Sequence, residues 1–178
     1  MPEAMFTTER LLVRHFHPDD LGAFAALCAD PEVMRYVGDG TTLPRPEVER
    51  WIGVCQQRYA ARGYGTSAVF ERATGEFVGY CGVVRAPGND FDELIYVFHR
   101  STWGRGYATE AGRAMLGYVF AHSSLSKIYA TIHADNRTSR KVADKLGMTV
   151  EKINDPDGEP VVFYVVSRDT FSGVQQPL

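Results

Sequence analysis

The amino-acid sequence predicts an α/β fold organised around a mixed sheet. Two observations carry this prediction. Branched, alternating runs typical of strands recur along the chain, and stretches with apolar residues at helical spacing separate several of them. The 178 residues suffice for one domain, which we place at 8–170, followed by a loose tail at 171–178.

The first half of the chain supplies one strand, the early helices and a hairpin. The branched run at 10–16 predicts the strand, and Asp19 and Asp20 suit the positive end of the helix that follows. Asp30-Pro31 stops that helix. The other elements expected here are a short helical piece at 31–36, a helix at 46–62, and strands at 64–72 and 76–85 joined as a hairpin.

The second half alternates strands with helices. Ala111, Met115 and Val119 recur at helical spacing and predict a helix at 107–122. Gly147 is expected as the left-handed cap of the next helix. The other elements expected here are strands at 92–99 and 127–133, a helix at 136–146, and a closing antiparallel pair at 148–154 and 161–167.

Composition excludes several classes of protein. The formal net charge is −3 and the pI is near 5.9, so the chain lacks the basic field of a nucleic-acid binder. Its three cysteines form neither a Cys-x-x-Cys pair nor a Cys/His cluster, so we expect reduced thiols and no metal. Residues 1–10 lack the apolar segment of a signal peptide, and no apolar run approaches a membrane span. We therefore expect a cytoplasmic protein with neither nucleic acid nor membrane as its partner.

A glycine-containing loop stands between the strand-like residues 94–98 and the helix at 107–122. Gly104 and Gly106 let backbone N–H groups approach an anion closely, and the unpaired first amides of a helix favour negative charge. This pattern predicts a pyrophosphate cradle, with an ordinary tight turn as the alternative. Thr109 stands where a dinucleotide motif needs its third glycine, and Gly-Lys-Ser/Thr is absent, so the pyrophosphate belongs to another carrier.

Several segments resemble, in the right order, the GNAT superfamily of N-acetyltransferases. Trp103-Gly-Arg-Gly-Tyr-Ala108, continued by Thr109-Glu-Ala111, is similar to that family's acetyl-coenzyme A loop, Gln/Arg-x-x-Gly-x-Gly/Ala. Trp103 in the first position and this continuation are typical of the branch of ribosomal-protein-alanine acetyltransferases, and the opening Thr8-Glu-Arg-Leu-Leu-Val-Arg14 adds to the resemblance. The resemblance implies a mostly antiparallel sheet of about seven strands with helices on both faces, whose fourth and fifth strands splay apart.

The resemblance also implies acetyl-CoA as the co-substrate. Its pantetheine arm would enter between the splayed strands and pair with the backbone of the fourth strand, where Ile95 replaces the branch's usual glycine. Asn136 would contact the coenzyme as well as cap its helix, and Arg105 either touches phosphate or stays solvated. The coenzyme-binding residues expected from the resemblance are Tyr96, Val97, Phe98, His99, Trp103, Gly104, Arg105, Gly106, Tyr107, Ala108, Thr109, Asn136 and Ser139.

Transfer of an acetyl group to an amine needs an uncharged amine, and an alkylammonium is mostly protonated at neutral pH. Glu93, at the edge of the expected cleft, is the first candidate for the base, with an ordinary surface charge as the alternative. His133 has a pKa range that suits proton shuttling, or is a plain edge-strand histidine. Ala143 stands where many GNAT enzymes carry an acidic tyrosine, so Ser139 is the candidate donor of a proton to the thiolate.

The segment between the first two expected strands corresponds to one wall of the acceptor cleft in the resembling family. Tyr36, Trp51 and Glu93 are the candidate substrate-binding residues, although Trp51 also suits burial on the apolar face of its helix. Acidic residues near the expected cleft favour a cationic acceptor, namely Asp39, Asp90, Asp92 and Glu93.

The sequence thus predicts an acetyl-CoA-dependent N-acetyltransferase. Its acceptor would be a primary amine, either a peptide N-terminus or a small molecule, which attacks the thioester directly in a ternary complex. A non-catalytic acyl-CoA-binding or sensing module is the alternative, because the tyrosine is missing. Related enzymes often dimerise, so a homodimer stays open.

Overall fold

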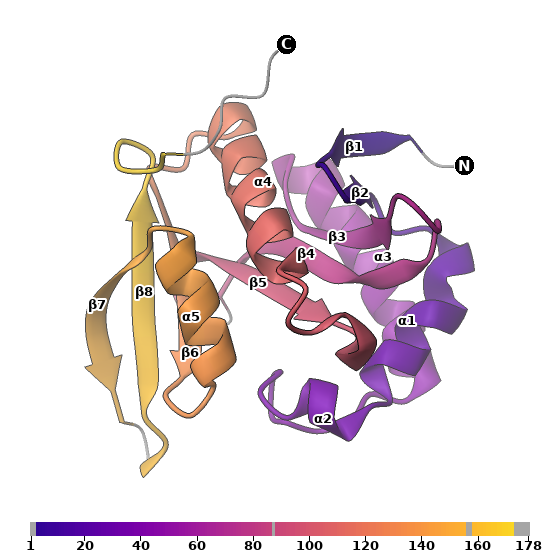
Figure 1. The fold of residues 1–178 in the computed structure, drawn as a ribbon, viewed down its shortest axis with the longest axis horizontal. Helices are drawn as coiled ribbons and strands as arrows, with labels where there is room; N and C mark the ends of the chain where they lie inside the picture. Colours follow the sequence, from indigo (N-terminus) through magenta and orange to yellow (C-terminus); the bar gives the residue numbers. More distant parts are fainter. Residues whose placement is uncertain (1–2, 87, 156–157, 173–178) are drawn as a thin grey trace.

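A computed structural model describes residues 3–86, 88–155 and 158–172 (Figure 1). Eight strands form one sheet in the order β1-β2-β3-β4-β5-β6-β8-β7, and all neighbours are antiparallel except β5 and β6. The strands are β1 (Ala4–Thr7), β2 (Leu11–Arg14), β3 (Thr66–Glu71), β4 (Phe77–Arg85), β5 (Asp92–Phe98), β6 (Lys127–His133), β7 (Thr149–Asn154) and β8 (Val161–Ser167). The helices are α1 (Leu21–Cys28), α2 (Pro31–Met34), α3 (Arg45–Arg62), α4 (Tyr107–His122) and α5 (Arg137–Lys145), with 3₁₀ turns at Pro18–Asp20 and Arg100–Thr102. The mixed, mostly antiparallel sheet expected from the sequence is confirmed.

The first strand, β1, is an addition to the seven expected ones. It is short and pairs with β2 in a hairpin in which Phe6 faces Val13. Phe6 is buried and its ring lies 5.4 Å from that of Tyr118 on α4. Because β1 has only four residues, its alternation of apolar and polar side chains is too short to predict a strand from the sequence. The contact with Tyr118 on α4 helps to hold β1 in place.

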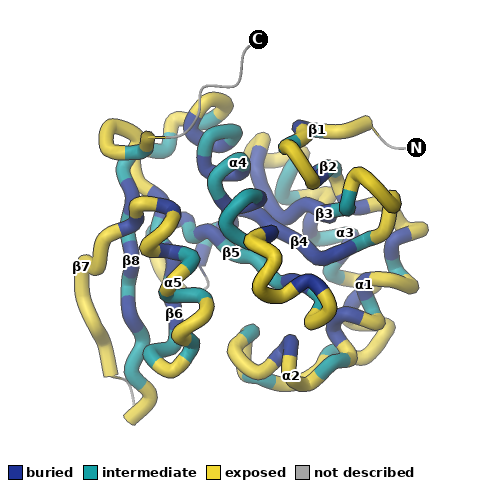
Figure 2. Tube along the Cα trace, in the orientation of Figure 1, coloured by how far each residue is buried: buried dark blue, intermediate teal, exposed yellow. Residues whose placement is uncertain are grey.

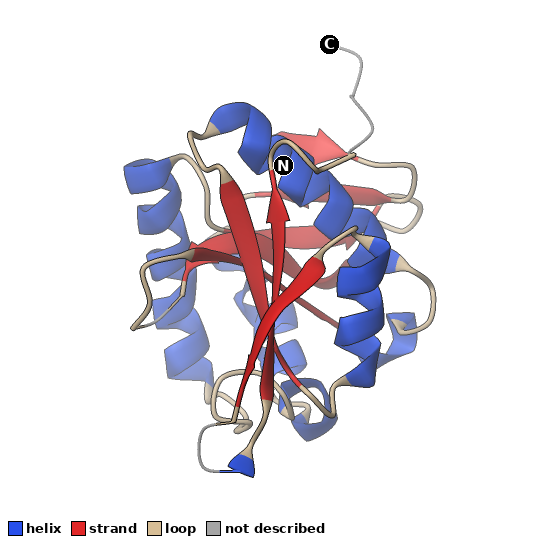
Figure 3. Cartoon of the chain, turned by 90° about the vertical axis from the view of Figure 1, so that its left-hand side faces the viewer, coloured by secondary structure: helices blue, strands red, loops and turns tan. Residues whose placement is uncertain are grey.

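The helices cover both faces of the sheet, as expected (Figure 3). One core lies between the sheet and helices α4 and α5, and a second lies between the sheet and helices α1 to α3. Figure 2 shows the buried residues following the central strands and the inward sides of the helices. Of the expected tail, 173–178 lie outside the described residues, whereas Phe171 packs on Phe120 with centroids 5.6 Å apart.

Local capping explains where the functional helices begin and end. Asn136 precedes α5, and its Oδ1 accepts a hydrogen bond of 3.1 Å from the backbone N–H of Ser139. Gly147 follows α5 with φ +76°, a left-handed conformation that favours glycine. Helix α4 occupies 107–122, the range that its apolar spacing predicts.

The parallel strands β5 and β6 are separated along most of their length. Their pairing is confined to one register position, Glu93 opposite Tyr129. On its other side β5 pairs with β4 continuously, from Asp92 opposite Arg85 to Phe98 opposite Gly79. The expected splay is therefore confirmed, and the backbones of the two strands part beside the loop that leads into α4 (Figure 1). We call this separation of the two backbones the β5–β6 gap.

Candidate active site

The loop before α4 presents backbone N–H groups at the β5–β6 gap. Gly104 and Gly106 have φ of +76° and +82°, and Gly106 is the N-cap of α4 without any side-chain cap. The first intrahelical bond runs from Glu110 N to Gly106 O, so the N–H groups of 107–109 precede the helical ladder. These amides and the helix dipole favour an anion at this end of α4.

Two side chains at the start of α4, those of Arg105 and Tyr107, are bonded to β3. Arg105 Nη2 lies 2.7 Å from Glu71 Oε1, which also accepts a hydrogen bond from the Tyr107 hydroxyl. Two guanidinium groups lie over the Tyr107 ring, with Arg10 4.9 Å and Arg105 4.7 Å from its centroid. The Arg105 side chain is thus neither solvated freely nor directed at the helix start, and it braces the loop against Glu71.

The backbone of β5 alternates between β4 and the β5–β6 gap. His99 N donates to Val78 O across the β4 side, 3.0 Å away. Successive residues of a strand direct their polar groups to opposite sides, so we expect Tyr96 and Phe98 to present theirs to the gap and Val97 to present its own to β4. The Phe98 carbonyl already accepts a hydrogen bond of 2.9 Å from Trp103 Nε1. This bond ties the coenzyme-binding loop expected from the sequence to the end of β5.

Helix α5 borders the gap from the other side. Tyr96 donates its hydroxyl hydrogen to the Ser139 carbonyl, 3.1 Å away, and so connects β5 to the first turn of α5. Burial is the main reason that the pKa of Tyr96 lies above its ordinary value. The Ser139 hydroxyl makes no hydrogen bond with any residue that the structure describes. The capping role expected for Asn136 is confirmed by its bond to Ser139 N.

Glu93 occupies the face of β5 opposite to this helix. Ile95 and Val97, which alternate with it, pack against the core that α1 and α3 cover. The Thr131 hydroxyl of β6 donates to Glu93 Oε2 over 2.5 Å. Burial raises the pKa of Glu93, and the hydrogen bonds with Thr131 oppose that shift without cancelling it. The carboxyl group therefore has a proton affinity shifted toward that of a base working near neutral pH.

His133 and Tyr36 lie together on the same side of the sheet as Glu93. His133 follows Thr131 by two residues along β6, so their side chains share a face. The Tyr36 ring, just beyond α2, stacks on the imidazole with centroids 5.4 Å apart. Asp135 N donates to His133 Nδ1 over 3.1 Å, which leaves Nε2 as the nitrogen that carries hydrogen in the neutral ring.

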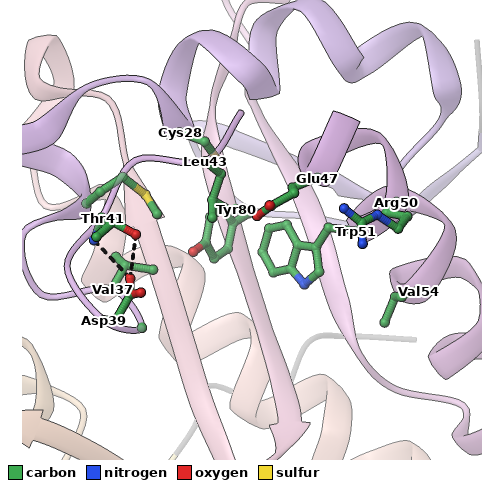
Figure 4. Close-up of a pocket in the computed structure, with 12 residues that line it drawn as sticks. Cys28, Val37, Asp39, Thr41, Leu43, Glu47, Arg50, Trp51, Val54 and Tyr80 are labelled. Carbon is green, nitrogen blue, oxygen red and sulfur yellow. Dashed lines mark hydrogen bonds between the residues drawn. The ribbon is translucent and has the colours of Figure 1, made fainter. Parts of the chain in front are cut away.

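Trp51 packs against core residues, as its place on the apolar face of α3 predicts, and it also borders a pocket. It packs against Phe24 and Tyr80 with centroids 4.8 and 5.0 Å apart, and it also lines a pocket of about 560 Å³ (Figure 4). The pocket has apolar walls, which include Met34 and Leu43, and its lining also includes Asp39, Glu47 and Arg50.

Tyr80 connects this pocket to β5, because it is the register partner of Val97. Its side chain is only 3% exposed. The hydroxyl has no hydrogen-bond partner among the described residues, and Figure 4 shows it directed into the pocket. The sequence offers no local signal for this group, because an apolar strand position and a pocket-lining one look alike.

The acidic cluster expected at the cleft is wrong for Asp92, and the arginine that pairs with Asp92 also binds a second member, Asp90. Asp92 is buried on the face of β5 opposite to Glu93, where Arg85 Nη2 and the Tyr64 hydroxyl each lie 3.1 Å from it. Asp90 pairs with the same arginine, Arg85, at 2.9 Å. Adjacent residues of a strand point to opposite faces, so neighbours in sequence are not neighbours in the site. Glu93 and Asp39 remain, and Asp39 accepts hydrogen bonds from Thr41.

The described part of the chain contains neither a metal-binding cluster nor a membrane-spanning helix. No group of three or more His, Cys, Asp or Glu residues there is arranged to hold a metal ion. No helix there has the length and apolarity that crossing a membrane requires.

Comparisons with known proteins agree with this geometry. Residues 10–149 match the model of the acetyltransferase (GNAT) domain. Protein YkkB of Bacillus subtilis (strain 168) is 33% identical over 162 residues, which cover 88% of this chain and 92% of the relative. The FsC-acetyl coenzyme A-N(2)-transacetylase of Aspergillus fumigatus is 32% identical over 167 residues, which cover 83% of this chain and 69% of the relative.

A solved structure gives the same result for the fold. The GNAT-family acetyltransferase from Bacillus anthracis superposes with a TM-score of 0.77 at 25% identity, over 92% of this chain and 98% of that one. With a family model that matches most of the chain, these relatives place it among the acyltransferases. The chain belongs to the GNAT acetyltransferase family.

Proposed function

We propose that this protein transfers an acetyl group from acetyl-CoA to a primary amine by direct attack within a ternary complex. The observation that carries the proposal is the position of Glu93. It lies at the single place where β5 and β6 still pair, at the end of the gap that the coenzyme arm would occupy. Its buried carboxyl group, with a raised pKa, is the base that an ammonium acceptor requires.

The coenzyme would occupy the gap and the loop together. Its pyrophosphate would accept hydrogen bonds from the N–H groups between Gly104 and Thr109, while Tyr107 and Arg105 brace the loop through Glu71. Its pantetheine arm would pair with the gap-facing backbone of Tyr96 and Phe98, as an added strand does. His99, Trp103 and Asn136 border the same path and complete the proposed coenzyme-binding set with Val97, Ala108 and Ser139.

The reaction would proceed in two proton-balanced steps. Glu93 removes a proton from the ammonium, and the amine nitrogen attacks the thioester carbon, so that the carbonyl oxygen becomes an oxyanion. The N–H of Phe98, which faces the gap, is our proposed donor to that oxygen. When the C–S bond breaks, the thiolate takes a proton from the Ser139 hydroxyl, and the second proton of the attacking nitrogen passes through water to the Ser139 oxygen, which restores the hydroxyl. His133, stacked on Tyr36, would relay the proton from Glu93 toward solvent.

The pocket beside Tyr80 supports a class of acceptor. Its walls are mainly apolar and its lining includes both acidic and basic side chains, so it suits an amine joined to an apolar body better than a polycation. The unpaired Tyr80 hydroxyl would donate to an oxygen of that body. A peptide N-terminus and a small amphipathic amine both meet this description, with Tyr36 and Trp51 as lining residues.

Four further assignments belong to this proposal. The opening segment at 8–14 and the continuation at 107–111 support the branch of ribosomal-protein-alanine acetyltransferases. The domain would extend over 8–170. A cytoplasmic location and self-association into a homodimer are predictions that fractionation and sedimentation would test.

The test is a turnover assay with acetyl-CoA and a panel of peptides and small amines. Free thiol and acetylated amine should form in equal amounts, and Glu93→Gln should abolish most of both while it still binds CoA. A panel that yields no thiol, with CoA binding intact, would contradict the proposed reaction.

A further inference from the structure

Two segments separated by about a hundred residues meet at the start of α4. The carboxylate of Glu110, in the first turn of that helix, accepts a hydrogen bond of 2.5 Å from the Thr8 hydroxyl and one of 2.9 Å from Arg10 N. Arg10 also places its side-chain Nε and Nη2 2.7 and 2.6 Å from Glu110 Oε2. We call Thr8, Arg10 and Glu110 the N-terminal clamp.

The clamp reaches into the loop itself. The third nitrogen of the Arg10 guanidinium, Nη1, donates to the Arg105 carbonyl over 2.8 Å, between the two glycines. A Cβ atom placed on Gly106 would lie 3.5 Å from Arg10 Nη2, so the guanidinium lies directly against that glycine. One side chain therefore holds the backbone of the loop and the first turn of α4 in a common position.

Charge gives the clamp a second effect. Burial alone would raise the pKa of Glu110, but the hydrogen bonds from Thr8 and Arg10 outweigh burial and lower it. Glu110 is therefore an anion in the helix turn that would receive another anion. Its side chain is only 17% exposed, so solvent screens it weakly, and Arg10 neutralises it at contact distance.

We propose that Arg10 and Glu110 are positioning residues for the coenzyme: they hold the glycine loop in its phosphate-binding shape, and Arg10 cancels the charge of Glu110 toward the pyrophosphate. This inference rests on the proposed phosphate site. A purely structural clamp would hold the β1–β2 hairpin on α4 and leave coenzyme affinity unchanged at a temperature where the variants are folded.

The first experiment compares CoA affinity, by calorimetric titration, for the parent protein, Arg10→Ala, Glu110→Gln and the double variant. Arg10→Ala leaves the carboxylate unpaired, so we expect its Kd to rise by about tenfold or more. The double variant should bind CoA more tightly than Arg10→Ala alone, because the repelling charge is then also absent. Two results would overturn the proposal: an unchanged Kd in Arg10→Ala, or a rise in Kd in the double variant that equals the product of the rises in the two single variants.

The second experiment separates positioning from general damage. S-acetyl-N-acetylcysteamine carries the thioester without a pyrophosphate, so its kcat/KM should change little in Arg10→Ala, whereas kcat/KM for acetyl-CoA should fall with the affinity for CoA. An equal fall with both thioesters would assign Arg10 a merely structural role. Arg10→Lys keeps the charge but cannot reach Glu110 and the Arg105 carbonyl together, so its affinity for CoA should be intermediate.

Arg168→Ala is the matched control. Arg168 donates to the carbonyls of Phe120, Ser123 and Leu125 at the opposite end of α4. This variant should lower the melting temperature without changing the Kd for CoA. If the parent protein itself fails to bind CoA, the phosphate site and the clamp fall together, an outcome distinct from parent-like binding in Arg10→Ala.

Discussion

The ring of Tyr36 stacks on the imidazole of His133, with centroids 5.4 Å apart and planes inclined by 28°. Tyr36 follows α2 and His133 ends β6, so this contact joins the helical wall of one half of the molecule to the strand that borders the gap. Tyr36 keeps 38% of its surface exposed, although it is a large aromatic residue. Such an aromatic pair, on the same face of the sheet as Glu93, is a natural contact for an incoming amine.

Tyr36→Ala should raise KM for the acceptor by about five- to tenfold, because a stacked, cation-binding ring contributes about 1 kcal/mol. KM for acetyl-CoA should stay within twofold of the parent value. Tyr36→Phe, which keeps the ring, is the control and should resemble the parent in steady-state kinetics. A rise in KM for acetyl-CoA alone would place this ring on the coenzyme path instead.

Glu93→Gln should lower kcat by about a hundredfold or more, the usual contribution of a general base. Thr131→Val should act through the pKa of Glu93. It removes the hydroxyl hydrogen bond that lowers this pKa and keeps the backbone one, so the acidic limb of the kcat profile should move to higher pH. An acidic limb at the same pH in Thr131→Val would show that another group titrates.

Glu93 should also reduce stability at neutral pH. Its folded-state pKa lies above the unfolded value, so its favourable contribution is complete below the unfolded pKa and is lost as pH rises through the folded pKa. The melting temperature of Glu93→Gln should therefore exceed that of the parent by more at pH 8 than at pH 4. Thermal unfolding at the two pH values measures the difference, and a larger gain at pH 4 would contradict the direction of the shift.

Gly106→Ala should weaken CoA binding, because an alanine at φ +82° is strained by roughly 1 kcal/mol or more and would relax by rotating the loop amides. Gly75→Ala is the matched control, since Gly75 has φ +74° in the β3–β4 turn and open space around its Cβ position. Both variants should lose comparable thermal stability. Only Gly106→Ala should change the Kd for CoA in calorimetric titration.

Tyr80→Phe should have opposite effects on stability and on acceptor binding. Its hydroxyl lacks a described partner in an almost fully buried side chain, so its removal should be neutral or stabilising in thermal unfolding. KM should rise about fivefold for acceptors that carry an oxygen near the amine, the value of one hydrogen bond, and stay constant for alkylamines. An equal effect on both kinds of acceptor would exclude a hydrogen bond from Tyr80.

Features that depend on neighbours in the chain are predicted well from the sequence. The spacing of Ala111, Met115 and Val119 predicts α4 with its observed bounds, because an amphipathic helix repeats its signal over several turns. Asn136 and Gly147 bracket α5 by local backbone chemistry alone. The glycine loop is predicted for the same reason, since it follows a strand and opens a helix.

Features that depend on strand register or on distant side chains are not predicted from the sequence. Asp92 and Glu93 look like one acidic pair in sequence, yet the strand directs Asp92 toward Arg85 and Tyr64 on one face and Glu93 toward Thr131 on the other. Arg105 has no local sign that its partner is Glu71, 34 residues earlier. The Thr131 contact with Glu93 likewise requires knowing which strands adjoin.

Because β5 and β6 pair at a single register position, the sheet consists of two halves, which we call blades: β1 to β5 form one blade, and β6, β8 and β7 form the other. Within each blade the strands are locked by backbone ladders, but the blades are joined mainly through side chains such as Tyr96 and the packing of α4 on α5. A change in the angle between the two blades breaks few backbone hydrogen bonds, so the protein deforms most easily along the β5–β6 gap. A ligand whose amide groups pair with the strands along the β5–β6 gap would hold the two blades at a fixed angle. The stiffness of the protein would then depend on the fraction of molecules that carry the ligand.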